Sequence, residues 1–142
     1  MRNIREIIVH CTATKAGRNV AVAEIDSWHK ARGWRGIGYH YVVMLDGSVS
    51  VGRSELSIGA HCLGRNSTSI GVVYVGGLDN DGVPCDTRTE AQKAGLLRIL
   101  VELLKKYPWA KIYGHRDFSP TACPCFDARR EYGHLMPPTT ER

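Results

Sequence analysis

Two histidines and a cysteine in this chain have the residue types and the surroundings of a zinc site. His10 closes a short apolar run, while His115 and Cys123 bracket a segment that contains Pro120. Imidazole nitrogen and thiolate sulfur are ligands that zinc accepts readily, whereas magnesium and calcium prefer oxygen. Three protein ligands leave one coordination position for water, which is typical of a catalytic zinc site rather than a structural one.

Each of these residues taken alone has an ordinary structural explanation. A single histidine at a strand end, such as His10, is more often hydrogen-bonded than ligating, and a single cysteine is more often a buried apolar side chain. His115 alone favours neither reading. The combination favours zinc, but the same residues leave a thiol hydrolase open, with Cys123 or Cys11 as the nucleophile beside one of the histidines.

Three further residues are candidates for contact with a substrate. Tyr39 begins a predicted strand, where its phenol could donate a hydrogen bond to a developing oxyanion, and an ordinary aromatic strand residue is the alternative. His61 and Asn66 lie in a polar segment that we predict to be a loop too polar for the core. Substrate contact is expected there, with a solvated loop histidine as the alternative. The remaining histidines, His29, His40 and His134, are expected to be structural or solvated.

Composition and missing motifs exclude several other classes of function. The sequence contains no G-x-S-x-G elbow, no H-E-x-x-H helix, no P-loop and no dinucleotide fingerprint. The formal charge is +5, and the lysines and arginines are spread along the chain, so nucleic-acid binding is not predicted. A mild positive field favours approach to an anionic polymer such as a cell wall.

The length of 142 residues predicts one domain, spanning residues 1–142. No apolar run is long enough for a transmembrane helix, and the first residues lack the apolar core of a signal peptide. The five cysteines are an odd number in a chain too long for a small disulfide scaffold. We therefore expect synthesis in a reducing cytoplasm.

Hydrophobic periodicity predicts strands over residues 5–10, 39–45, 70–75 and 111–113. Asp46-Gly47 is typical of a two-residue hairpin turn, with a return strand over residues 49–51. Residues 15–19, 54–69 and 78–86 are expected to form loops and turns, and the chain after Tyr132 is expected to be irregular.

Two helices are predicted. In the first, Val22, Ile25, Trp28 and His29 share a face and Gly33 supplies the stop. The second should begin with a capping box from Thr87 to Glu90, and Pro108 lies beyond its end. Its predicted apolar face is Leu96, Leu97, Leu100, Leu103 and Leu104.

The order strand, helix, hairpin, strand, helix, strand predicts an α/β fold in which helices pack on a central mixed sheet. His10 and His115 would both stand at strand ends, so we expect them to meet on one rim of the sheet.

Five separated motifs resemble one known family in order and in spacing. They are IVHCTAT (residues 8–14), GYHY (38–41), GAH (59–61), NSTSIGV (66–72) and HRDFSPTACP (115–124). From about residue 5 to residue 127, the chain resembles the zinc-dependent N-acetylmuramoyl-L-alanine amidases. That family includes short phage lysozyme-type amidases and animal peptidoglycan-recognition proteins, and the similarity is greatest to the phage or prophage type.

The resemblance implies a zinc groove on one face of the sheet, with one Zn²⁺ held by His10, His115 and Cys123. It implies hydrolysis of the amide between the lactyl group of N-acetylmuramic acid and L-alanine, with Tyr39 in a catalytic role. Thr121 stands where related phage enzymes carry a catalytic lysine, and a threonine there resembles the recognition-protein branch. A hydroxyl still donates a hydrogen bond to the oxyanion, but it lacks the long-range attraction of an ammonium.

The implied partner is peptidoglycan. The protein would reach it after release from the cytoplasm, as an endolysin does. Binding to a membrane or to nucleic acid is not expected, and the expected oligomeric state is a monomer. A module that recognises muropeptides without cleaving them is one alternative. A regulator that binds a viral RNA polymerase, as some phage members do, is another. For the ligating imidazoles, Asp117, Asp127 or backbone carbonyls are the expected hydrogen-bond acceptors.

Overall fold

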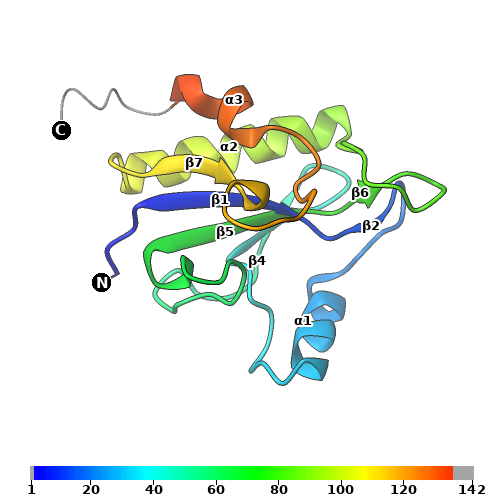
Figure 1. Cartoon of the computed structure of the whole chain (residues 1–142), viewed down its shortest axis with the longest axis horizontal. Helices are drawn as coiled ribbons and strands as arrows, with labels where there is room; N and C mark the ends of the chain where they lie inside the picture. The colour runs from blue at the N-terminus through cyan, green and yellow to red at the C-terminus, as the bar shows by residue number, and fades with distance from the viewer. Residues whose placement is uncertain (1, 136–142) are drawn as a thin grey trace.

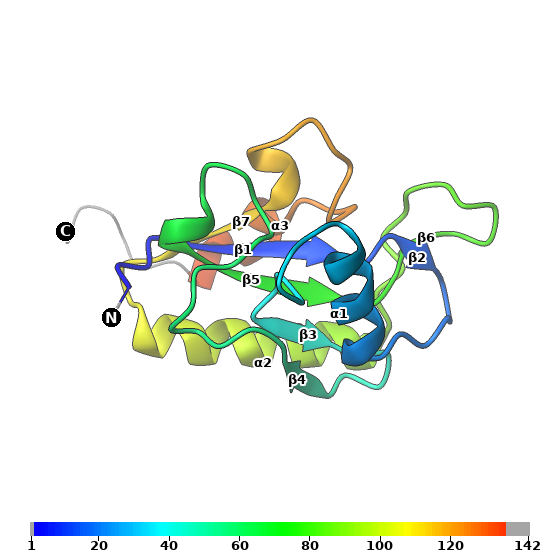
Figure 2. The ribbon, with the colours of Figure 1, turned by 90° about the horizontal axis from the view of Figure 1, so that it is seen from below.

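The computed structural model describes residues 2–135 and contains a five-stranded mixed sheet in the order β4-β3-β5-β1-β7. Figure 2 shows these strands side by side, with β1 and β5 at the centre. Strands β1, β5, β3 and β7 run parallel where they pair, and only β4 is antiparallel. The bounds are β1 Glu6–Cys11, β3 Tyr41–Val43, β4 Val49–Val51, β5 Ser69–Tyr74 and β7 Lys111–Gly114.

Helices cover both faces of the sheet, which confirms the predicted α/β class. Helix α2 (Glu90–Lys106) packs its leucines against one face together with α3 (Ala128–Tyr132), while α1 (Val22–Ala31) packs on the other. Figure 1 shows α2 and α3 on one side of the central strands and α1 on the opposite side. In the described part of the chain, no helix combines the length and the apolar character needed to cross a membrane.

Strand β1 is buried along its whole length, as expected for a central parallel strand. Ile7, Val9 and Cys11 join the core under α2. Because side chains alternate across a strand, Ile8 and His10 face the other side. His10 is therefore a buried polar side chain, 1% exposed, at the carboxyl end of the strand.

The predicted hairpin is confirmed, but its turn is not the predicted two-residue turn at Asp46-Gly47, because Leu45 and Asp46 are the central residues; β3 is also shorter than the predicted strand. Gly47 has φ +86°, a conformation that favours glycine, and its N–H donates to Met44 O over 2.9 Å. Tyr39 and His40 precede the regular ladder. The backbone N–H of His40 nevertheless donates to Gly71 O over 2.9 Å, so the approach to β3 is held against β5.

The predicted capping box of α2 is wrong by two residues. Thr89 is the N-cap: its hydroxyl accepts from Gln92 N, and the Gln92 side chain accepts from Thr89 N, each over 3.0 Å. The hydroxyl of Thr87 instead accepts a hydrogen bond from Gly77 N over 2.8 Å. The sequence contains two overlapping capping patterns, one from Thr87 to Glu90 and one from Thr89 to Gln92. Because the Thr87 hydroxyl is bonded to Gly77, only the second pattern caps the helix.

The apolar face of α2 is confirmed at Leu96, Leu100 and Leu103, which are buried, but Leu97 is 42% exposed. In the predicted loops, β2 (Thr14–Lys15) pairs with β6 (Gly77–Leu78), so Lys15 belongs to a short strand. Short 3₁₀ helices form at Asn66–Thr68, His115–Asp117 and Gly133–Leu135. Helix α3 was not predicted, and the predicted irregular tail beyond residue 135 lies outside the described residues.

Candidate metal centre

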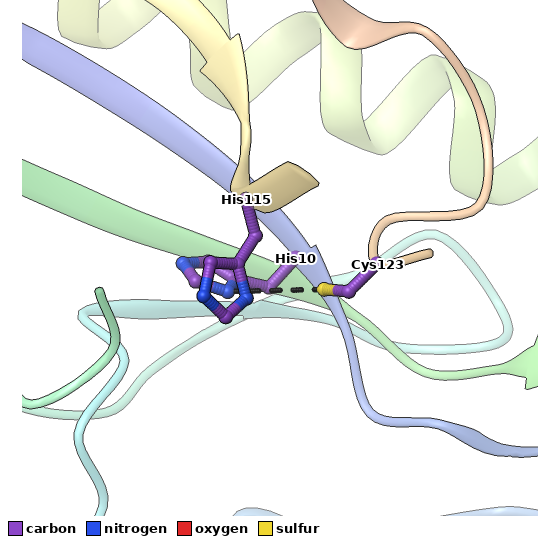
Figure 3. Close-up of side chains that lie close together, drawn as sticks. All are labelled: His10, His115 and Cys123. Carbon is purple, nitrogen blue, oxygen red and sulfur yellow. Dashed lines mark hydrogen bonds between the residues drawn. The ribbon is translucent and has the colours of Figure 1, made fainter. Parts of the chain in front are cut away.

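The three predicted zinc ligands meet at one end of the sheet. His10 is the next-to-last residue of β1, His115 follows β7 directly, and Cys123 comes from the loop before α3. One ligand atom from each residue lies within 4.8 Å of the others. Figure 3 shows the two imidazoles and the thiol pointing toward one another. The convergence follows from the parallel pairing of β1 and β7, whose carboxyl ends reach the same edge.

The donor set fits zinc in chemistry and in size. Zinc bonds to nitrogen and sulfur are about 2.0–2.3 Å long, so tetrahedral ligand atoms lie roughly 3.3–3.8 Å apart. The Sγ atom of Cys123 is 3.9 Å from Nδ1 of His10, close to that range. The backbone N–H of Cys11 donates to Cys123 Sγ over 3.2 Å, and such a bond favours the thiolate that a metal requires.

The loop that carries Cys123 is anchored at the cysteine and at the residue after it. Arg116 N donates to Cys123 O over 2.8 Å, and the buried hydroxyl of Tyr74 donates to Pro124 O over 2.7 Å. A Cβ atom on Gly114 would lie 2.8 Å from the ring of Pro124, so this close approach requires glycine. The thiol is thus held in place by the sheet before any ligand binds.

Burial favours the neutral form of both candidate histidine ligands. Burial lowers the pKa of His10 well below its usual value, with further contributions from His61, His115 and His29. Burial also lowers the pKa of His115. A neutral imidazole has a free lone pair on one nitrogen, which is the form that binds a metal.

Tyr39 lies beside this cluster, as predicted. Its ring centroid is 5.1 Å from that of His10, and His29 packs against its other side at 5.3 Å. The Nδ1 atom of His29 accepts a hydrogen bond from Gly38 N over 2.8 Å, which holds the backbone just before the tyrosine. Burial raises the pKa of Tyr39, as does the nearby Cys123. The phenol therefore keeps its proton and remains a hydrogen-bond donor at neutral pH.

Thr121 lies near the cluster but is engaged with its own loop. Its hydroxyl accepts a hydrogen bond from Cys123 N over 3.3 Å, and the residue is exposed. The hydroxyl proton is left to donate elsewhere. The structure thus places Thr121 at the outer side of Cys123, two residues from the thiol.

His61 is buried rather than solvated, so the expectation of a loop too polar for the core is wrong at this residue. Its Nδ1 lies 2.8 Å from His10 Nε2, and its Nε2 lies 3.1 Å from Ser69 Oγ. Burial lowers its pKa to about 3. Asn66 supports this segment from inside, because its side-chain oxygen accepts hydrogen bonds from the backbone N–H groups of His61 and Cys62.

The predicted acidic partners of the imidazoles have other roles. A carboxylate oxygen of Asp117 accepts a hydrogen bond from Gly114 N over 2.8 Å, and Asp127 caps α3 by accepting from Arg130 N. The partner of His10 is His61. The sequence analysis did not predict this contact. The only local indication was Gly59 close to His61 in the GAH motif (residues 59–61), because glycine permits close packing against a ring.

An open cavity of about 390 Å³ adjoins the cluster. Its lining includes Trp34, His61, Leu63, Asn66, His115 and Ser119. Leu63 is 92% exposed and Trp34 is partly exposed, so the outer part of the cavity is apolar. The metal-ligand candidate His115 is therefore reachable by a large substrate.

The neighbouring cysteines are poor nucleophiles. The hydrogen bond with Cys123 and burial both raise the pKa of Cys11. Burial raises the pKa of Cys125 to about 12, with Cys11 adding to the effect. Because the thiolate is the reactive form, these two thiols are unreactive at neutral pH. This weighs against the thiol hydrolase with Cys11 as nucleophile.

Comparison with known proteins identifies relatives that are similar to this chain over most of its length. A sequence model of the N-acetylmuramoyl-L-alanine amidases matches residues 1–126. The endolysin of Enterobacteria phage T3 is 48% identical over 124 residues, which cover 87% of this chain and 82% of that protein. Peptidoglycan-recognition protein SC1a of Drosophila melanogaster is 32% identical over 123 residues, covering 82% of this chain and 65% of that protein.

Solved structures show the same architecture. The N-acetylmuramoyl-L-alanine amidase LysC from Clostridium intestinale superposes with a TM-score of 0.79 at 30% identity, covering 94% of this chain and 86% of that one. Drosophila PGRP-LB superposes with a TM-score of 0.77 at 23% identity, covering 94% of this chain and 81% of that one. The second likeness concerns the fold alone.

Proposed function

The chain belongs to the N-acetylmuramoyl-L-alanine amidase family, and we propose that it is a zinc enzyme with His10, His115 and Cys123 as ligands. Its activity is that of a peptidoglycan amidase. The bond that we propose it hydrolyses joins the lactyl group of N-acetylmuramic acid to L-alanine of the stem peptide. The observation that carries the zinc proposal is the convergence of two neutral imidazoles and a hydrogen-bonded thiol beside an open cavity.

The chemistry that zinc supplies in such sites is a bound water with a pKa lowered to about 7 and a polarised substrate carbonyl. The protein's own part is to hold the ligands ready. His10 and His115 are kept neutral by burial, and the thiolate of Cys123 is favoured by the N–H of Cys11. A non-cleaving recognition module would need none of these features.

Tyr39 is the proposed donor to the oxyanion that forms at the scissile carbonyl. Its phenol stays protonated, and its position between His10 and His29 is rigid, so no reorganisation is needed as charge develops. Thr121 is proposed to add a second hydroxyl donor from the outer side. We propose that the Tyr39 hydroxyl also relays a proton to the leaving amine of L-alanine, taking a proton from a neighbouring water molecule as it gives up its own.

The cavity lined by Trp34 and Leu63 is the proposed entrance for the peptidoglycan strand. Apolar side chains beside a site suit the carbon face of a sugar ring. His61 and Asn66 are proposed to shape this entrance from below rather than to bind through their polar atoms, which bond within the protein. We further propose that residues 1–142 act as one monomeric catalytic domain, made in the cytoplasm and acting on the wall after release.

The test pairs metal analysis of the purified protein with product analysis on purified peptidoglycan. We expect one zinc per chain and new amino-terminal L-alanine groups, whose appearance stops with a chelator and resumes when zinc is restored. Cleavage by metal-free protein would contradict the zinc proposal. Bound zinc without cleavage would favour recognition instead.

A further inference from the structure

A buried chain of hydrogen bonds runs away from the metal side of His10. It passes from His10 Nε2 to His61 Nδ1 over 2.8 Å and from His61 Nε2 to Ser69 Oγ over 3.1 Å. It ends where the Ser69 hydroxyl donates to the carbonyl of Arg65 over 2.7 Å. His10, His61 and Ser69 are 1%, 8% and 0% exposed. Buried groups of this kind must be satisfied inside the protein, so each contact matters.

The carbonyl at the end of this chain sets the direction of every bond. A carbonyl oxygen can only accept a hydrogen bond, so the Ser69 hydroxyl donates its single proton to the carbonyl of Arg65. The oxygen of Ser69 must then accept a hydrogen bond from Nε2 of His61. The proton of a neutral His61 is then on Nε2, which leaves its Nδ1 as an acceptor. His10 must therefore carry its proton on Nε2, and its Nδ1 is bare. That bare nitrogen is the one that lies 3.9 Å from Cys123 Sγ.

The ring of His61 is also held in a slot that only glycines permit. A Cβ atom on Gly71 would lie 2.6 Å from His61 Cγ, and one on Gly59 would lie 2.6 Å from His61 Cδ2. The backbone N–H of His61 is bound by Asn66. The position and the orientation of the His61 ring are thus both set before a metal binds, by residues from two separate segments.

We propose that His61 is a positioning residue that fixes the tautomer and the orientation of His10, so that Nδ1 of His10 is presented to the zinc. This inference rests on the proposed zinc function. It departs from the expectation that an acidic side chain or a backbone carbonyl would do this work, and it assigns His61 a role inside the protein rather than at the substrate.

A purely structural role predicts something different. If His61 only fills the space between Gly59 and Gly71, a ring of the same size should preserve the site. If it acts as the acceptor for His10, loss of Nδ1 should matter even when the slot stays filled. Phenylalanine keeps the ring and removes the acceptor, whereas asparagine is smaller but places a side-chain oxygen near the position of Nδ1.

The experiment compares His61→Phe and His61→Asn with the wild type for zinc affinity, by competition with a chromophoric chelator. Loss of an outer partner of a ligating histidine typically costs about 10–100-fold in metal affinity. We expect that loss for His61→Phe and substantial recovery for His61→Asn. His40→Phe is the control, because His40 is buried against the same ring but does not contact His10. Equal affinity of His61→Phe and wild type would overturn the inference.

A second measurement needs no metal. Long-range proton–nitrogen correlation spectra of metal-free wild type report which ring nitrogen of each histidine carries the proton. We expect Nε2–H on both His10 and His61, and an Nδ1–H on His10 would overturn the inference whether or not the variants fold. A wild type that has these tautomers but does not bind zinc would instead refute the proposed function and leave the hydrogen-bond chain standing.

Discussion

The backbone N–H of Cys11 donates a hydrogen bond to the sulfur of Cys123 over 3.2 Å, although 112 positions separate the two residues. The donor belongs to the last residue of β1, and the acceptor belongs to the loop before α3. Hydrogen bonds to a thiolate favour its charged form, because the donor compensates for lost hydration. The first strand therefore contributes to this site both a proposed ligand, His10, and a group that stabilises the thiolate of another proposed ligand, Cys123.

Replacement of the sulfur tests its role as a ligand. Cys123→Ser exchanges a soft thiolate for a hydroxyl that is hard to ionise, so zinc and amidase activity should be lost together. Even the loss of an outer-shell partner costs about 10–100-fold in affinity, and removal of a ligand should cost at least that much. Zinc content and release of L-alanine amino groups are the measurements. Cys125→Ser is the matched control, and full zinc occupancy in Cys123→Ser would refute the ligand assignment.

Tyr39→Phe separates metal binding from catalysis. The variant should keep its zinc, because the phenol is not among the ligand candidates, while the turnover number should fall about 10²–10³-fold through loss of an oxyanion donor. KM should change little if the hydroxyl acts mainly in the transition state. Steady-state kinetics on soluble muropeptides give both constants. An unchanged turnover number would make Tyr39 a packing residue.

Thr121→Lys introduces an ammonium where the family resemblance implies a catalytic lysine in phage enzymes. The position is exposed, so a lysine fits without displacing core atoms, and its ammonium should attract the developing oxyanion. We expect a modest increase in rate at low ionic strength. The gain should shrink as salt is added, because exposed charges are screened. Rates measured across a salt series check this, and a sharp fall in rate would mean that the site depends on the threonine hydroxyl.

Stability of the metal-free protein should fall as the pH is lowered from about 6.5 to about 4, in part through His40. Burial lowers the pKa of His40 in the folded protein to about 4, from an ordinary value of 6.5. Between these values the unfolded chain binds more protons than the folded one, so protonation favours unfolding. Protonation of His40 would also break a hydrogen bond, because its Nδ1 accepts from Gly71 N over 3.0 Å and a protonated Nδ1 cannot accept.

Urea unfolding with a chelator present, repeated across this pH range, measures that dependence. His40→Phe should flatten the slope, because its side chain has no proton to gain. The other buried histidines will leave a residual slope of the same sign. A His40→Phe variant with the wild-type slope would show that His40 takes up its proton as readily in the folded protein as in the unfolded chain.

Local pattern in the sequence was sufficient to predict the main elements and to select the three candidate metal ligands that the structure brings together. Strands β1 and β7 and the hairpin of β3 and β4 follow from apolar runs and turn chemistry, which act over a few residues. His10 and His115 were placed at strand ends by the same patterns. Their meeting then follows from parallel pairing of the two strands.

The tertiary structure alone decided which of two equivalent local choices is used and which polar side chains are buried. Thr87 and Thr89 both begin a capping pattern, and contact with Gly77 selects Thr89 as the cap. His61 occurs in a segment whose composition predicts exposure. Its burial requires two residues of β5 to meet it, Gly71 beside its ring and Ser69 as the acceptor of its proton. Such contacts depend on how distant parts of the chain pack, and no local pattern contains that information.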